Sequence, residues 1–152
     1  MDYNKRSGAE LSFIDRLINV DQSVASQFRA GLRRDLEDLL NTVIRARSFP
    51  DYLNELDHSL INFGIKDLLT TNMSTSSERD KVILYIQKTI EKYEPRLMNI
   101  SIVNISDNEN RSHTLALRII AETIIDNNPE EIIFNSKIDV STGAVITNVS
   151  AR

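Results

Sequence analysis

The spacing of apolar residues changes once along the chain, at the segment 90–97, which reads Ile-Glu-Lys-Tyr-Glu-Pro-Arg-Leu. Before this segment, apolar residues recur at intervals of three and four, as on one face of a helix. After it, they alternate with polar residues, as on one face of a strand. Pro95 has no amide hydrogen and restricts the residue before it, so a helix must end near Tyr93. We therefore expect helices in the first part of the chain and strands in the second.

The apolar pattern predicts three helices before this proline. The longest covers residues 23–45, and a shorter one covers residues 52–62. The third begins after Thr75, whose spacing to Glu78 is typical of a capping box, and it ends near Tyr93.

The alternating pattern predicts about four antiparallel strands after the proline, separated by polar turns. These strands cover residues 97–105, 114–125, 131–140 and 144–149. The expected fold class is α+β, with three N-terminal helices packed on a small C-terminal antiparallel sheet. Residues 1–20 are expected to form an N-terminal arm with a short amphipathic segment, and residues 21–152 a single domain.

Composition narrows the functional classes. The chain has 152 residues, of which 41% are apolar, and this suits one domain with one hydrophobic core. The formal charge is −4 and the basic residues are scattered, which argues against nucleic acid as a partner. No run approaches the roughly 18 apolar residues of a membrane span, the first residues are polar, and there is no cysteine. We expect a cytoplasmic protein that does not insert into a membrane.

The sequence offers no set of residues for catalysis. The two histidines, His58 and His113, belong to different predicted elements and to no ligand cluster, so a metal site is not expected. There is no glycine-rich phosphate loop and no nucleophile elbow. We expect no enzymatic activity, no catalytic residue, no metal and no cofactor.

The sharpest polar feature is the sequence Glu94-Pro95-Arg96. In an extended segment, residues i and i+2 point to the same side, so Glu94 and Arg96 are expected to lie together. Three interpretations are open. The pair is a helix stop with two solvated charges, a contact for a partner protein, or a contact between Arg96 and carboxylates on the long helix of the same chain.

Four segments resemble a known family when taken together. They are residues 34–42, 59–67, 94–97 and 134–143. In this order they are similar to TssE, the small baseplate wedge subunit of type VI secretion systems, which is related to the sheath-initiating wedge protein of contractile-tailed phages. The resemblance implies a non-enzymatic scaffold that joins TssF, TssG and TssK and lies beneath the first sheath ring of TssB and TssC. It also implies that Glu94, Pro95 and Arg96 contact a partner.

The last hairpin suggests how such a subunit would act. An uncovered C-terminal strand offers unpaired backbone groups that another chain can extend, and Val145 and Val149 are the residues where we expect this contact. Two other functions are open. One is a peptide-binding adaptor or chaperone that uses the same sheet edge, and the other is a lysozyme-like peptidoglycan hydrolase.

Overall fold

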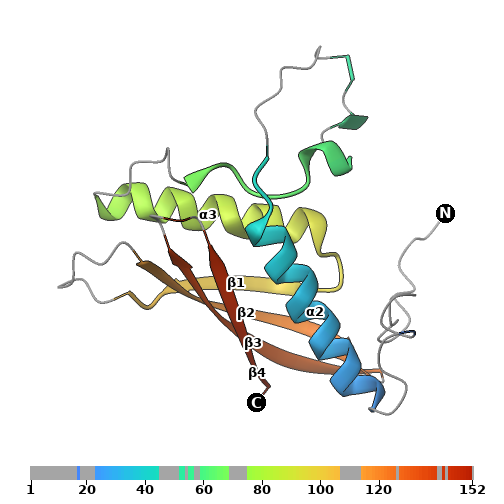
Figure 1. Cartoon of the computed structure of the whole chain (residues 1–152). Helices are drawn as coiled ribbons and strands as arrows, with labels where there is room; N and C mark the ends of the chain where they lie inside the picture. Colours follow the sequence, from blue (N-terminus) through green and yellow to red (C-terminus); the bar gives the residue numbers. More distant parts are fainter. Residues whose placement is uncertain are drawn as a thin grey trace.

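The computed structural model describes residues 17, 23–44, 52–53, 55–56, 59–68, 75–106, 114–125, 127–139, 142 and 144–151. Within these ranges the chain forms two α-helices, a short 3₁₀ helix and a four-stranded antiparallel sheet (Figure 1). The helices are α2 (Val24–Asn41), η2 (Leu60–Asn62) and α3 (Ser76–Tyr93). The strands are β1 (Met98–Asn104), β2 (Thr114–Ile125), β3 (Asn128–Asp139) and β4 (Val145–Ala151). The α+β class is confirmed.

Both α-helices begin at side-chain caps. Ser23 accepts a hydrogen bond from the backbone N–H of Ser26 at the start of α2. At the start of α3, Thr75 and Glu78 form the reciprocal capping box that their spacing predicts. The end of α3 at Tyr93 also agrees with the prediction from the proline two residues later.

The prediction of three α-helices is wrong for the segment 52–62. Its described part contains the 3₁₀ helix η2 instead, and Leu60 in that helix is 87% exposed. A short amphipathic helix depends on packing of its apolar face, and no buried core covers this face within the described residues. The side chains of Ser59 and Asn62 both donate hydrogen bonds to the backbone oxygen of Leu56, which favours a turn over a regular helix.

The sheet is a simple meander with the strand order β1-β2-β3-β4, so β1 and β4 are its two edge strands within the described residues. Alternate side chains of the sheet are buried beneath the two helices, which lie on the same face (Figure 1). Helix α2 packs chiefly on β4, and α3 packs chiefly on β1. The largest fully buried side chains include Phe28, Leu36, Ile86, Ile119 and Phe134.

Polar contacts fix α2 to the sheet near both ends. Arg29, near the start of the helix, forms an ion pair with Glu130 of β3. Asn41, the last residue of the helix, bonds to the backbone of Val145 in β4. No helix in the described part of the chain is long and apolar enough to cross a membrane.

Candidate functional site

The Glu-Pro-Arg segment forms the tight turn that connects α3 to β1. The Glu94 N–H donates to the Ile90 oxygen at 2.8 Å, and the Leu97 N–H donates to the Glu94 oxygen at 3.1 Å. Pro95 is exposed, but only 5% of Glu94 is exposed. The first interpretation, a helix stop with two solvated charges, is therefore wrong, because Glu94 is part of the interior.

Arg96 binds Glu94 through two parallel contacts. Its Nε donates to Glu94 Oε1 at 2.5 Å, and its Nη2 donates to Glu94 Oε2 at 2.6 Å. This two-pronged geometry matches the planar guanidinium to the planar carboxylate. The prediction that the side chains of Glu94 and Arg96 lie together is confirmed.

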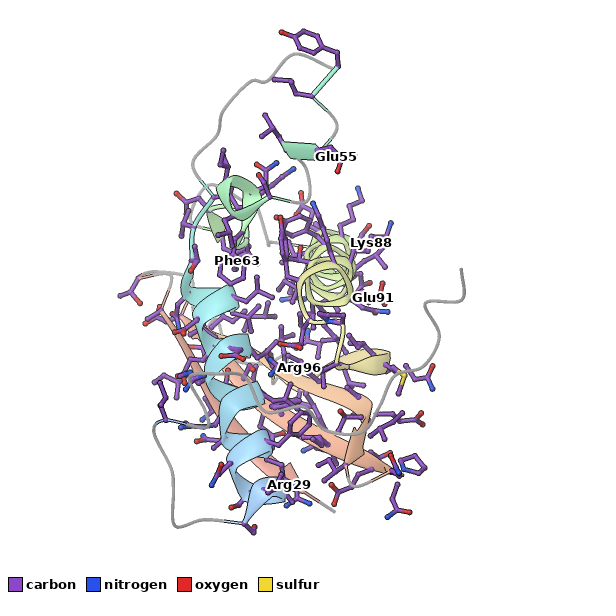
Figure 2. All side chains as sticks on the ribbon, turned by 90° about the vertical axis from the view of Figure 1, so that its right-hand side faces the viewer. Arg29, Glu55, Phe63, Lys88, Glu91 and Arg96 are labelled. Atoms are coloured by element: carbon purple, nitrogen blue, oxygen red, sulfur yellow. The ribbon has the colours of Figure 1, made fainter. Side chains whose placement is uncertain are left out.

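The same guanidinium also reaches the long helix. Arg96 Nη2 donates to Asp35 Oδ2 at 2.6 Å, and Arg34 Nη2 donates to the other Asp35 oxygen at 3.1 Å. Figure 2 shows Arg96 between the helices and the sheet. This contact matches the third interpretation of the motif, in which Arg96 binds a carboxylate on the long helix of the same chain.

Burial and charge act in opposite directions on Arg96. Burial disfavours the charged guanidinium, but the hydrogen bonds and charges of Glu94 and Asp35 outweigh it, so the pKa of Arg96 is raised above its ordinary value. The guanidinium also lies 5.9 Å from the centre of the Phe28 ring, and Thr123 donates to the Arg96 backbone oxygen at 2.9 Å. Arg96 is therefore fixed by contacts from α2, the turn and β2.

A surface pocket of about 420 Å³ lies over this ion-pair network. It is lined by Asp35, Asp38, Leu39, Phe63, Tyr93, Glu94, Pro95 and Arg96. Two contacts position its aromatic wall: the rings of Phe63 and Tyr93 meet edge to face at 5.4 Å, and the Tyr93 hydroxyl donates to the Asn62 oxygen at 2.6 Å. The pocket combines an apolar wall with charged groups, as is typical of contacts with other molecules.

Gly64 shapes the base of that wall. Its φ of +118° lies in the region that favours glycine, and an added Cβ would lie 2.2 Å from the Thr42 oxygen. The close approach lets the Ile65 N–H donate to the Thr42 oxygen and the Ile44 N–H donate to the Ile65 oxygen, both at 2.8 Å. The end of α2 is thereby joined to the segment that carries Phe63.

The outer edge of β4 is a second candidate site. The Asp139 N–H donates to the Ala144 oxygen, so this pair is a hydrogen-bonded pair of the β3–β4 ladder. Bonded and non-bonded pairs alternate in an antiparallel ladder. The backbone N–H and C=O groups that point away from β3 are consequently those of Val145, Thr147, Val149 and Ala151.

The two residues predicted for this edge, Val145 and Val149, differ in what the structure shows of their outward backbone groups. The Val145 N–H donates to Asn41 Oδ1 at 2.8 Å, and its C=O accepts from Asn41 Nδ2 at 3.0 Å. Val145 is thus already paired within the chain, whereas a bare edge was expected there. The side chain of Val149 lies outside the described residues. Its backbone lies opposite Phe134, and its N–H and C=O groups are among those that point away from β3. Sequence reasoning missed Asn41, which lies inside the helix predicted over residues 23–45, whereas α2 ends at Asn41 in the structure.

Metal chemistry has no candidate among the described residues, where no three His, Cys, Asp or Glu side chains form a group that could hold an ion. His58 and His113, singled out in the sequence, lie outside the described residues.

Comparison with known proteins gives one match. A family model described as baseplate wedge protein gp25 matches residues 26–129, which include α2, α3 and the Glu-Pro-Arg turn. The matched range ends before β4. No curated protein and no solved structure matches the chain.

Proposed function

Because the chain belongs to the baseplate wedge protein gp25 family, a structural family of contractile systems, we propose that it is a subunit of a type VI secretion baseplate that helps to start the contractile sheath. In this proposal it joins the wedge formed by TssF, TssG and TssK, at a baseplate docked on the inner membrane. Its role there is to present a surface on which the first ring of TssB and TssC assembles.

The outer edge of β4 is the single observation that carries the sheath part of this proposal. No strand in the described part of the chain lies on that side of β4. Beyond the buried Thr147, Val149 and Ala151 direct backbone groups away from β3, and a strand from another protein can bond to such groups. We propose that a strand of a sheath subunit extends the sheet at this edge.

The Glu-Pro-Arg turn supports a separate contact with the wedge. Pro95 is exposed, and about a quarter of the Arg96 side chain is accessible beside the pocket. Glu94 and Asp35 hold the guanidinium in place, so the charged group is ordered before a partner arrives. A partner would then meet Pro95, the accessible part of Arg96 and the Phe63–Tyr93 wall, whereas Glu94 acts from beneath as a positioning residue.

Binding to sheath subunits tests the proposal. Purified TssB and TssC are passed over the immobilised chain and over two variants, Val149→Pro and Val149→Ala. The proline removes an outward amide, whereas the alanine keeps it, so retention is expected for the wild type and the alanine variant and is lost for the proline variant. Equal retention of sheath subunits by all three proteins would contradict pairing at β4.

A peptide-binding adaptor would use the same edge. It differs from the proposed baseplate subunit in how selectively it binds its partners. An adaptor binds extended peptides of unrelated sequence with similar affinity, since backbone bonds supply most of the contact. A baseplate subunit is expected to retain sheath and wedge subunits and to release unrelated peptides.

A further inference from the structure

The pocket over the Glu-Pro-Arg turn is open to solvent and carries an excess of negative charge. Its volume is about 420 Å³, and two of the residues that line it, Asp38 and Pro95, are exposed. Its described lining includes three carboxylates but one guanidinium, and these groups belong to Asp35, Asp38, Glu94 and Arg96. The pocket is therefore accessible in the free chain, and its charge favours a cation.

Two of the three carboxylates are neutralised within the chain. Arg96 binds Glu94 through two contacts and Asp35 through a third. Arg34, from outside the pocket, binds the other oxygen of Asp35 at 3.1 Å. The two guanidinium groups balance the charges of Glu94 and Asp35, and the charge of Asp38 is left over.

Asp38 has no such partner in the part of the chain that the structure describes. Its carboxylate takes part in no ion pair or hydrogen bond there, and only its backbone oxygen is used, by Thr42. Arg34 lies four residues earlier, at the spacing of a helical ion pair, but its guanidinium is held by Asp35. The carboxylate of Asp38 is thus available to a group from another molecule.

The fold gives no reason for a carboxylate at this position. Asp38 lies in the last turn of α2, where the partial negative charge of the helix end disfavours an acidic side chain. Its side chain is also exposed, so it adds little to the core. Binding of a partner accounts for a charge that the fold does not use.

The aromatic wall of the pocket suits a long basic side chain. Phe63 and Tyr93 offer an apolar surface for methylene groups, and the faces of such rings attract cations. One contact of this kind already occurs here, since the Lys92 ammonium lies over the Tyr93 ring at 5.0 Å. An acidic group would be repelled by Asp38, and an apolar group would bury its charge without a partner.

We propose that the pocket receives a lysine or arginine side chain of a wedge subunit, with Asp38 as its counter-charge. The proposal rests on the proposed function, in which the wedge meets the Glu-Pro-Arg turn. In the complex, the cation lies beside Asp38, and its methylene groups lie against Phe63 and Tyr93.

Affinity for the wedge measures the contribution of Asp38. The dissociation constant of the purified TssF–TssG complex is measured with the full chain and with its Asp38→Asn and Asp38→Lys variants. We expect at least about tenfold weaker binding by the asparagine variant and no binding by the lysine variant, because a cation buried in a complex depends on its counter-charge. Equal or tighter binding by Asp38→Asn would overturn the proposal.

Glu37→Gln is the matched control for Asp38→Asn. Glu37 precedes Asp38 on α2, the change again removes one negative charge, and its side chain lies outside the pocket lining. Its affinity for the wedge is expected to match the wild type, and all variants are expected to unfold at nearly the wild-type urea concentration, because neither side chain is buried. An equal loss of affinity in Glu37→Gln would overturn the proposal, since net charge would then decide binding.

A small probe tests the pocket without the wedge. N-acetylarginine methylamide carries a guanidinium, and the corresponding citrulline derivative has nearly the same shape without the charge. In an NMR titration of the full chain, we expect the arginine derivative to shift the signals of Phe63 and Tyr93. Binding is expected to be at least about threefold weaker for the citrulline derivative, and for the arginine derivative with Asp38→Asn. Equal binding of both derivatives by the wild type would overturn the proposal.

The two hypotheses fail in different ways. If the wild-type chain does not bind the TssF–TssG complex, the proposed place in the wedge is wrong, and the probe titration still decides whether the pocket takes a basic side chain. If the wild type and Asp38→Asn bind the complex equally, the place in the wedge stands and the role of Asp38 is wrong.

Discussion

Arg96 Nη2 lies 2.6 Å from the Asp35 carboxylate, and this contact joins the turn after α3 to the middle of α2 across 61 positions of sequence. The same guanidinium holds the buried Glu94 through two further contacts. The Glu-Pro-Arg turn is therefore part of the packing between the helices and the sheet, as well as a candidate surface for the wedge.

Removal of Arg96 is expected to destabilise the isolated chain. Arg96→Ala leaves the buried carboxylate of Glu94 without its counter-charge, which costs about 2 to 5 kcal/mol of unfolding free energy. Arg96→Lys is expected to fall between the alanine variant and the wild type, because an ammonium cannot bind Glu94 with two parallel bonds and Asp35 at once. Thermal or urea unfolding measures both changes.

Arg33→Ala is the matched control for these variants. Arg33 lies on the same helix as Asp35, is more exposed than Arg96, and approaches Glu37 only to 3.9 Å. Its removal is expected to change stability by less than about 0.5 kcal/mol. Equal stability of the Arg96→Ala and Arg33→Ala proteins would show that the buried network does not stabilise the fold.

Gly64→Ala tests the connection between the end of α2 and the aromatic wall of the pocket. The new Cβ would lie 2.2 Å from the Thr42 oxygen, at a φ of +118° that alanine adopts poorly. We expect a loss of at least about 1 to 3 kcal/mol in unfolding free energy from backbone strain. Chemical denaturation is the measurement, and a fully stable variant would mean that this segment can move away from α2 without cost.

A buried hydroxyl pair between β3 and β4 offers a double-mutant test. Ser136 and Thr147 are both buried, and their hydroxyl oxygens lie 3.0 Å apart. Ser136→Ala or Thr147→Val alone leaves one buried hydroxyl without this partner, at an expected cost of about 1 to 3 kcal/mol. The double variant is expected to cost less than the sum of the two single changes. Simple additivity in urea unfolding would contradict coupling through this contact.

Most of the fold could be predicted from local sequence. Pro95 marks the end of α3 because a proline cannot continue a helix, and Thr75 marks its start through a local capping box. The alternating pattern predicts the strands because side chains on one face of this sheet are buried under the helices. These signals depend only on residues close together in the sequence and on which side chains are buried.

The errors concern features that depend on distant contacts. The apolar stripe around Leu60 resembles a helix face, but no described surface covers it, and the chain forms a 3₁₀ turn instead. One interpretation of the sequence has Glu94 solvated, yet Arg96 compensates its charge inside the fold, and the same guanidinium also binds Asp35. Asn41 lies inside the predicted helix 23–45, and only the position of Val145, far along the chain, gives it a role at the end of α2.

Initiation of sheaths in cells tests the central claim most directly. A strain without the chain is complemented with the wild type, Val149→Ala or Val149→Pro, and labelled sheaths are counted together with recruitment of each protein to the baseplate. The account predicts normal recruitment for all three, normal sheath numbers with the wild type and Val149→Ala, and very few sheaths with Val149→Pro, whose outward amide is missing. A normal number of sheaths in cells with folded, recruited Val149→Pro would contradict the claim that β4 starts sheath assembly by strand pairing.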